Sequence, residues 1–425
     1  MSAGRLERAA APAMAALGVA SMAWLGLYGF GWNDYETEAL PAMQALVHGH
    51  FASFAQLAPS YGGSLLLRAP FAFLPSVWGG GSLAVYQAVS IPCLLAAALL
   101  GLWLCARMRA DGQSRLARAL ALGLCVANPL TLRALELGHA DELLEASLCV
   151  AAVLLAASTS KAQTRRFAIQ PRAIFAGVCV GAAIGSKEWA LIALGPVLFA
   201  LRGGRVQMLA AAAVAAAALL APIALLSSSF VSATGSAAST TSTIFQPWQA
   251  FWFLGHQGAL VHGLFGNAKP GYRTAPSWVG PISHPLIVLT GVLLPLALWW
   301  RRRGSSIGVP DALLLLTLLS LLRCLLDTWD NVYYTLPLLI GLLSWEALTF
   351  KRPPAIALCA TVLCWGSFQW MPAIASPDLQ AAFFIAWTVP LAAALALRLY
   401  APGFSVAAAL GAAAPPTRKT PLAES

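Results

Sequence analysis

The sequence predicts an all-α membrane protein, a bundle of about twelve transmembrane helices. Of its 425 residues, 59% are hydrophobic and only 10% are charged, and the mean hydropathy is +0.74. Apolar runs of roughly 17–22 residues recur along the chain, and runs of this length suit a bilayer. No alternation of apolar and polar residues is sustained over about ten positions, as a membrane β-barrel requires. Helices are therefore expected to carry the backbone through the lipid.

Basic residues fix the expected orientation. They gather in short links between apolar runs, such as Arg107 to Arg118 and Arg301 to Arg303, which is the positive-inside pattern. Because the basic residues behind the net charge of +10 are placed in this way, they indicate orientation in a lipid bilayer and do not point to a nucleic-acid partner. Both termini are expected in the cytoplasm, with residues 1–400 as one transmembrane domain and 401–425 as a disordered cytoplasmic tail. The expected spans are 13–31, 82–104, 118–133, 142–159, 173–186, 188–201, 206–226, 285–300, 310–326, 332–349, 355–371 and 381–398.

Two long external segments are expected, at about 32–81 and 227–284. The first contains Leu65 to Trp78, an apolar stretch interrupted by Arg68 and two prolines, which we expect to lie at the outer interface as a helix. In the second, Ser227 to Thr243 is rich in Ser, Thr and Ala and is expected to be flexible. The remainder is dense in aromatic residues, which fits an interfacial lid, a surface on which a sugar or lipid rests, or an anchor in the headgroup region.

The fifth expected span carries Gly177, Gly181 and Gly185, one glycine every four residues. Small residues at this spacing form a face that lets a neighbouring helix approach closely. We therefore expect a helix–helix contact on this face.

Motifs of soluble enzymes and cofactor sites are absent. The sequence has no Walker loop, no Gly-x-Ser-x-Gly, no His-Glu-x-x-His and no glycine fingerprint after a strand. The eight cysteines show no metal-binding spacing and no disulfide framework. The sequence thus predicts no metal and no cofactor, and it favours a lipid-linked substrate over a nucleotide.

Three acids follow the first span within five positions: Asp34, Glu36 and Glu38. A carboxylate at the membrane–water boundary is suited to act as a general base for a substrate hydroxyl. The alternative is a solvated helix end. Spacing alone leaves Asp34 and Glu36 as rival candidates for the base.

Two external basic residues are candidate phosphate ligands. Arg68 lies among leucines and phenylalanines, where it could hold a phosphate bidentately beside lipid or snorkel toward headgroups. Lys187 stands outside against the charge bias, so we expect it to have a partner, which is either Glu188 or a phosphate.

A polar turn is expected at residues 136–145, ELGHADELLE. Glu136 and His139 are three positions apart, as are His139 and Glu142, and helical metal sites use this spacing. One such pair across a glycine-containing turn is too little to predict a metal. His139 and Glu142 are candidates for substrate binding or acid–base assistance, or they belong to a plain polar turn.

The segment 326–334, LDTWDNVYY, combines acids with aromatic residues. Asp327, Asp330 and Tyr333 are candidates for a wall that binds a sugar or a lipid headgroup. An interfacial anchor with its acids in water is the alternative.

Together these pieces resemble the GT-C glycosyltransferases, most closely the family 87-like bacterial members of the alpha-mannosyltransferase type. The resemblance implies a hexosyltransferase that moves a mannose-like sugar, with inversion, from polyprenyl phosphate to a glycolipid or glycan acceptor. It places the active site outside the bacterial plasma membrane. The segments that carry it are 33–50, 59–70, 128–144, 185–189 and 327–334.

The resemblance also suggests roles for individual residues. It implies Asp34 as the base that activates the acceptor, ahead of Glu36. It implies Arg68 and Lys187 as ligands of the donor phosphate. His139 and Glu142 would lie in the cavity wall, although many relatives carry a glutamine where this chain has His139.

Two other classes of function remain as alternatives. A transporter or lipid flippase would need ionisable groups near the bilayer midplane and access from both faces. A non-catalytic membrane scaffold would have an inert external surface. The clustering of the acids at the external edge favours the transferase.

Overall fold

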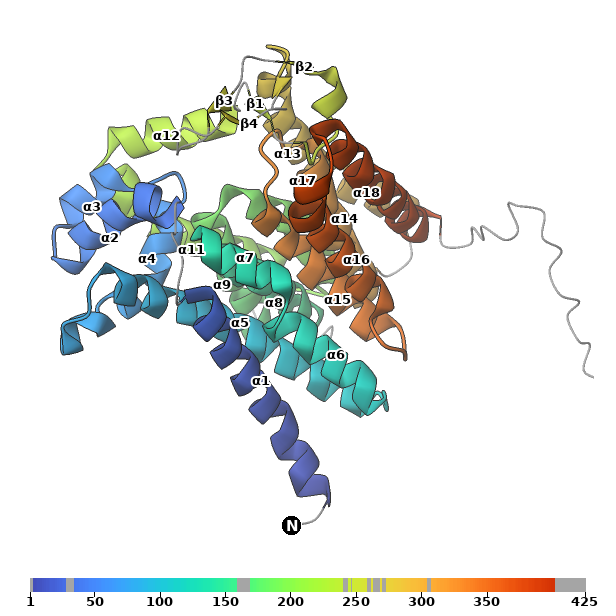
Figure 1. Ribbon diagram of the computed structural model, residues 1–425. Coiled ribbons are helices and arrows are strands. Elements are labelled where there is room, and N and C mark those ends of the chain that lie inside the picture. Colours follow the sequence, from blue (N-terminus) through green and yellow to red (C-terminus); the bar gives the residue numbers. More distant parts are fainter. Residues whose placement is uncertain are drawn as a thin grey trace, which may run out of the picture.

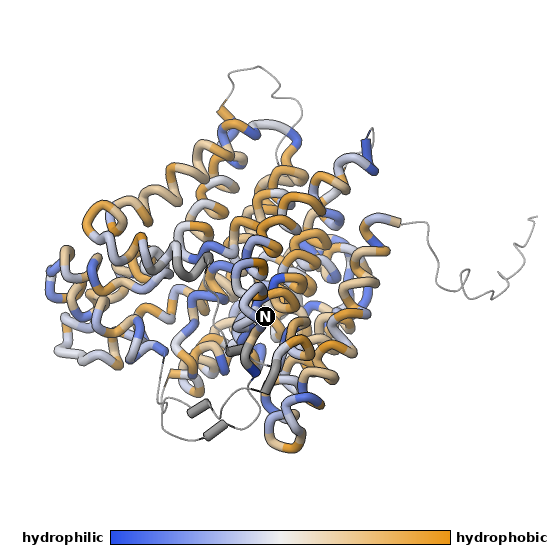
Figure 2. The backbone as a smooth tube through the Cα atoms, turned by 90° about the horizontal axis from the view of Figure 1, so that it is seen from above, coloured by the Kyte–Doolittle hydropathy of each residue, from blue (hydrophilic) through white to orange (hydrophobic). Residues whose placement is uncertain are grey.

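The computed structural model is a bundle of helices, most of which run between two opposite ends of the molecule (Figure 1). Hydrophobic residues run along most of the helices, and hydrophilic residues occur at many of the turns and helix ends (Figure 2). Of the tail expected at 401–425, residues 402–425 lie outside the residues described. The structure describes residues 3–27, 34–158, 169–239, 244–245, 247–257, 261–262, 268–269, 273–303 and 307–401.

Within these ranges, nine helical segments are long and apolar enough to cross a membrane, which confirms the predicted all-α polytopic fold. The membrane-length segments are α1 (Ala3–Leu27), α5 (Ser82–Ala110), α6 with α7 (Arg115–Val126, Pro129–Leu137), α11 (Arg205–Ala224), α13 (Val279–Arg301), α14 (Val309–Leu326), η6 with α15 (Val332–Thr335, Leu336–Thr349), α16 with η7 and α17 (Ala355–Trp365, Gly366–Trp370, Met371–Ile374) and α18 (Pro377–Tyr400).

The other three expected spans are also helical but shorter: α8 (Asp141–Ala157), α9 (Pro171–Ser186), and η4 with α10 (Glu188–Ala193, Leu194–Ala200). Their length has a physical reason, because charged residues mark their outer ends. Asp141 begins α8, and Lys187 separates α9 from η4. Charged residues within a membrane bundle need polar or charged partners, so each apolar run ends at the charged residue.

The two ends of the molecule differ in charge. The N-terminus and the turn between α5 and α6 lie at one end, while α2, α3 and α12 lie at the other (Figure 1). Arg107 and Arg109 lie in the last turn of α5, and Arg115 begins α6. Following the charge rule, we refer to the end that bears α12 as the outer end.

The first external segment folds into short helices: η1 (Tyr35–Ala39), α2 (Leu40–Val47), α3 (Phe51–Leu57), α4 (Gly62–Ala72) and η2 (Leu74–Trp78). The helix expected at 65–78 corresponds to α4 and η2. Val77 and Trp78 at its end are exposed, as an interfacial element would be. Arg68 on α4 is instead buried within the bundle.

The glycine face predicted on α9 packs against α11. A Cβ at Gly177 would collide with the backbone oxygen of Met208, and one at Gly181 with the backbone oxygen of Ala212. A Cβ at Gly185 would lie 3.0 Å from the Leu219 side chain. The glycines therefore allow the two backbones to approach closely, which confirms the packing prediction.

The second external segment is more structured than expected. The flexible stretch predicted at 227–243 is wrong for Ser228–Ser239, which forms helix α12. Its start is stabilised because the Ser227 hydroxyl accepts a hydrogen bond from the Phe230 amide, and the Phe230 side chain is buried. Two small antiparallel sheets and a 3₁₀ turn follow: β1 (Ile244–Phe245), η5 (Trp252–Leu254), β2 (His256–Gln257), β3 (Val261–His262), β4 (Ala268–Lys269) and β5 (Arg273–Thr274).

A clamp joins this segment to the start of α18. Arg273 pairs with Asp378 at 2.5 Å, and the Trp252 indole N–H donates a hydrogen bond to the same carboxylate at 2.8 Å. The Arg273 guanidinium also lies over the Trp252 ring, 5.0 Å from its centroid. Trp252 is fully buried, so one part of the aromatic segment is held in the fold.

Helix α13 begins at Val279, before the span expected at 285–300. Val279 and Ser283 are buried, and the Ser283 hydroxyl donates a hydrogen bond to the Leu326 carbonyl at the end of α14. This contact draws the first turns of α13 into the bundle. His284, expected in the loop, therefore lies on the helix.

Substituting Gly181→Ala should destabilise the bundle by about 1–3 kcal/mol, because the added methyl group meets the α11 backbone. Thermal unfolding of the purified protein in one detergent would measure the loss. Gly123→Ala on α6 is the matched control, since a Cβ there meets no heavy atom within 4 Å. An equal melting temperature for both variants would contradict the proposed close contact.

Candidate functional site

A cavity of about 770 Å³ opens among the outer ends of the helices. It lies where η1 and α4 meet the starts of α8, η4 and α13 and the end of α14. Its walls combine acids, bases and aromatic rings in an otherwise apolar bundle. The ionisable and phenolic residues that line it are Glu38, Tyr61, His139, Glu142, Lys187, Glu188, His284, Arg323, Asp327, Tyr333 and Tyr334.

A tight turn places His139 beneath the acidic segment. Helix α7 starts with Asn128 capping its amides and ends at Gly138, whose φ is +90°. Gly138 is pressed against the backbone of Tyr35, so that a Cβ there would lie 2.7 Å from the Tyr35 nitrogen. Only glycine suits both the left-handed conformation and this approach. The turn therefore fixes His139 directly against η1.

His139 joins two carboxylates. Its Nε2 lies 3.2 Å from Asp34 Oδ2, and its Nδ1 lies 3.8 Å from Asp141 Oδ1. The imidazole also stacks on the Tyr333 ring at 4.1 Å. The side chain of Asp34 is 25% exposed, whereas those of His139 and Asp141 are buried. Asp34 is thus the most exposed residue in a series of polar contacts that runs through His139 to the buried Asp141.

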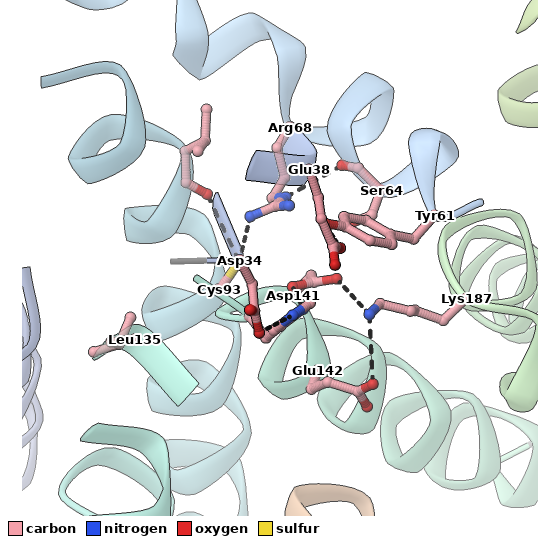
Figure 3. A network of polar contacts seen from close by, with 12 residues as sticks. Asp34, Glu38, Tyr61, Ser64, Arg68, Cys93, Leu135, Asp141, Glu142 and Lys187 are labelled. Carbon is pink, nitrogen blue, oxygen red and sulfur yellow. Dashed lines mark hydrogen bonds and ion pairs between the residues drawn. The ribbon is translucent and has the colours of Figure 1, made fainter. Parts of the chain in front are cut away.

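Lys187 continues this series of polar contacts. Its Nζ lies 3.1 Å from Asp141 and 3.6 Å from Glu142, and it stands over the Tyr61 ring at 4.5 Å (Figure 3). Burial lowers the pKa of Lys187, but Asp141 and Glu142 raise it by more, so the pKa is raised overall. Lys187 therefore keeps its positive charge inside the cavity.

Arg323 approaches the same Glu142 from the other side. Its two terminal nitrogens lie 3.4 and 3.5 Å from the Glu142 oxygens. The guanidinium is held between aromatic rings, 4.0 Å from the Tyr334 centroid and 4.8 Å from that of Trp189. Two cations thus face the cavity on either side of one buried carboxylate, an arrangement that could receive a phosphate.

Glu38 forms part of the opposite wall. The Tyr61 hydroxyl donates a 2.7 Å hydrogen bond to Glu38 Oε2. Burial, followed by the Glu38 charge, raises the pKa of Tyr61 well above its ordinary value, so Tyr61 stays a neutral donor. The hydrogen bond therefore fixes the Glu38 carboxylate at the cavity surface.

A second acid–imidazole pair lies on the wall formed by α13 and α14. His284 Nε2 is 3.6 Å from Asp327 Oδ2, and the Trp329 amide donates a 2.9 Å hydrogen bond to Asp327 Oδ1. Burial raises the pKa of Asp327, but the contacts with His284 and Arg323 lower it by more, and the net shift is downward. Asp327 is therefore ionised at neutral pH.

An apolar groove of about 480 Å³ adjoins the cavity. It runs between the η4–α10 segment and α13. Three residues line both spaces: Leu191, Val288 and Val292. The groove continues along α13 as far as Trp299, near the opposite end of that helix. The polar cavity and the apolar groove thus meet at these three residues.

The structure gathers most of the residues predicted from the sequence. His139, Glu142, Lys187, Asp327 and Tyr333 line the cavity, and Asp34 reaches it through His139. The remaining three predicted residues do not line it.

Arg68 is 3% exposed and hydrogen-bonds the Ser64 carbonyl. Asp330 is fully buried behind the wall, where burial and then the Asp327 charge raise its pKa well above the ordinary value. Glu36 is exposed on η1 and is absent from the cavity lining.

Several cavity residues received no assigned role from the sequence, among them Glu38, His284, Arg323 and Trp329. Arg323 could have been identified from the sequence, because it is a basic residue on the expected external side, against the positive-inside pattern, as Lys187 is. Glu38 belonged to the recognised acidic cluster. Trp329 belonged to the recognised segment 326–334. His284 gave no signal, since its place depends on where α13 begins.

No family model matches this chain, and no curated protein matches it either. Among solved structures, the chain is similar to ArnT from Cupriavidus metallidurans, whose crystal structure contains undecaprenyl phosphate. The sequences are 17% identical, the match covers 95% of this chain and 71% of that chain, and the TM-score is 0.44. At this level of similarity, the chemistry has to be inferred from the cavity residues themselves.

Replacing Lys187 by methionine should lower the free energy of unfolding by about 3–5 kcal/mol, because Asp141 loses its nearest cation in a buried site. Chemical or thermal unfolding in detergent would measure this. Lys351→Met, at an exposed turn between α15 and α16, is the control and should unfold like the wild type. Equal stability of the two variants would show that the buried ion pair is not a stabilising contact.

Proposed function

We propose that this protein is a membrane glycosyltransferase that takes a sugar from a polyprenyl-phosphate donor and transfers it to an acceptor hydroxyl at the outer face. The observation that carries this proposal is that the charged cavity and the apolar groove lie side by side and share Leu191, Val288 and Val292 in their walls. A substrate that fills both spaces has a charged head and a long apolar tail. A polyprenyl-phosphate sugar has this form.

The groove suits the first part of the tail. From Val288 to Trp299 it follows about 16 Å of helix α13, at 1.5 Å per residue. Its lining is aliphatic and aromatic, apart from Arg205. Isoprene units would gain apolar contact there without displacing any hydrogen-bonded group.

Lys187 and Arg323 are suited to the donor phosphate. Each is buried, cationic and directed at the cavity. When the bond to the sugar breaks, the phosphate gains a negative charge, and fixed cations stabilise that charge most in a site shielded from water. Glu142 holds the two cations apart and in place before the substrate binds.

Asp34 is suited to the role of base. It accepts the proton of the acceptor hydroxyl, whose oxygen attacks the anomeric carbon while the bond from that carbon to the phosphate oxygen breaks. The electron pair of the broken bond leaves with the phosphate. A single displacement of this kind inverts the anomeric centre. His139 holds the Asp34 carboxylate toward the cavity.

Glu38 is the structural rival for this role, since its carboxylate lines the cavity directly. Glu36 has less support because it is exposed and lies off the cavity lining. The finer assignments extend the sequence resemblance: a mannose-like hexose, a glycolipid or glycan acceptor, and the outer face of a bacterial plasma membrane.

The position of the charges weighs against a transporter. The ionisable cavity residues on α8, α13 and α14 lie within about two turns of the outer ends of these helices: Glu142 is the second residue of α8, His284 lies five residues after the start of α13, and Arg323 lies three residues before the end of α14. A transporter needs such groups near the midplane, with access from both faces. A site confined to one end suits a reaction at that end.

The Asp34→Asn substitution should lower the rate of transfer by about 10²–10⁴, with donor binding retained, because only proton abstraction is lost. Release of free polyprenyl phosphate from a panel of polyprenyl-phosphate sugars, supplied to purified protein with acceptor, would measure it. Glu36→Gln is the matched control and should keep nearly the full rate. Full activity of Asp34→Asn together with an inactive Glu38→Gln would move the base to Glu38.

Filling the groove should weaken donor use selectively. Val292→Trp places a large ring where cavity and groove meet, and we expect KM for a long-chain donor to rise about tenfold as tail contacts are lost. Leu293→Trp is the control, because Leu293 is equally exposed on the same helix, at 51%, but lines neither space. A similar KM for both variants would argue that the tail lies elsewhere.

A further inference from the structure

Glu142 is the most deeply buried of the three charged groups that meet in the cavity wall. The side chains of Lys187 and Arg323 are 10% and 5% exposed, whereas that of Glu142 is 0% exposed. All three residues line the cavity. A ligand in the cavity therefore has more access to the two cations than to the carboxylate that lies between them.

The ion pairs that Glu142 forms are long. Lys187 Nζ lies 3.6 Å from its carboxylate, and the two terminal nitrogens of Arg323 lie 3.4 and 3.5 Å away. Close hydrogen bonds between a cationic nitrogen and a carboxylate measure about 2.7–2.9 Å. A lysine ammonium has three donor hydrogens and a guanidinium has five. Both cations therefore keep hydrogen-bonding capacity for an anion in the cavity.

Glu142 also weakens the attraction that these cations exert on such an anion. A phosphate in the cavity is attracted by Lys187 and Arg323 but repelled by the carboxylate between them. Both energies are proportional to the charge of the ligand, and at a buried site they are little screened by salt. The repulsion from Glu142 is therefore larger for a doubly charged phosphate than for a singly charged one.

Given the proposed glycosyl transfer, we propose that Glu142 limits the affinity of the cavity for the spent carrier, so that polyprenyl phosphate leaves once the sugar has been transferred. The donor is a phosphodiester with one negative charge. When its bond to the anomeric carbon breaks, the electron pair stays on the phosphate oxygen. The product is a phosphomonoester, which carries nearly two negative charges at neutral pH. Two cations without Glu142 would retain this product more tightly than the donor, and the carboxylate opposes that.

The proposal can be tested by binding alone, without any transfer reaction. Suitable probes are farnesol, the methyl ester of farnesyl phosphate, and farnesyl phosphate, which share one prenyl chain and carry zero, one and nearly two negative charges. Dissociation constants for all three would be measured at pH 7.5 on the purified full-length protein in detergent. The comparison is between the wild type and Glu142→Gln, which removes the charge and keeps the shape of the side chain.

Glu142→Gln should bind farnesyl phosphate about 25-fold more tightly than the wild type does, the methyl ester about fivefold more tightly, and farnesol equally well. The logarithm of the gain thus rises in proportion to the charge of the ligand, which a loosened or reshaped cavity would not produce. Glu346→Gln is the matched control. Glu346 is also fully buried but lies outside the cavity lining, where it accepts hydrogen bonds from the Ile356 and Ala357 amides. Its substitution should leave all three affinities unchanged.

The outcomes separate this proposal from the proposed function. If Glu142→Gln binds farnesyl phosphate no more tightly than the wild type, or gains equally for all three probes, the role of Glu142 is overturned while the lipid-phosphate donor stands. If neither the wild type nor the variant binds either phosphate ester, the donor class itself fails, and the role of Glu142 fails with it.

A second pair of variants carries the same test if Glu142→Gln does not fold, as judged by its melting temperature. Arg323→Gln loses one cation, and the double variant with Glu142→Gln loses both members of that ion pair, while Lys187 keeps Asp141 at 3.1 Å. The double variant should bind farnesyl phosphate about tenfold more tightly than Arg323→Gln, because the repulsion is removed. Equal affinities of these two variants would overturn the proposal.

Discussion

The site depends on one buried carboxylate, that of Glu142. Its side chain is completely inaccessible, yet it contacts Lys187 on one side and Arg323 on the other. Two cations in an apolar bundle would repel each other and would each bear the cost of lost hydration. The shared carboxylate offsets both penalties, and it ties α8 to the junction of α9 with η4 and to α14. The ion pairs of Glu142 therefore hold together the helices that form the cavity.

The sequence alone predicted the helices well, because length and apolarity determine which segments suit a bilayer. It also indicated that Lys187 has a partner, since a lysine placed against the charge bias needs a counter-charge. The partner it suggested was Glu188 or a phosphate, whereas the structure places Asp141 and Glu142 beside Lys187. Which faces meet is decided by packing between distant helices, and local spacing does not record it.

The contrast between Arg68 and Arg323 makes the same point. Both lie at the outer side in apolar surroundings, and the sequence favoured Arg68. In the structure Arg68 turns toward Ser64 and Cys93, whereas Arg323 faces the cavity. Likewise, Asp34 and His139 are 105 positions apart, and only the turn at Gly138 brings them together. One-dimensional patterns identify which residues are costly to bury but not what each of them faces.

The apolar groove is open along one side. Val288, Val292 and Leu296, which line it, remain about half exposed, so its outer edge belongs to the surrounding lipid. A carrier lipid would enter sideways by diffusing in the plane of the membrane, with no need to thread its tail through a tunnel. Carriers of very different length would then exchange at similar rates, since the distal tail never leaves the bilayer. A glycan acceptor that arrived from the aqueous side would not compete for that route.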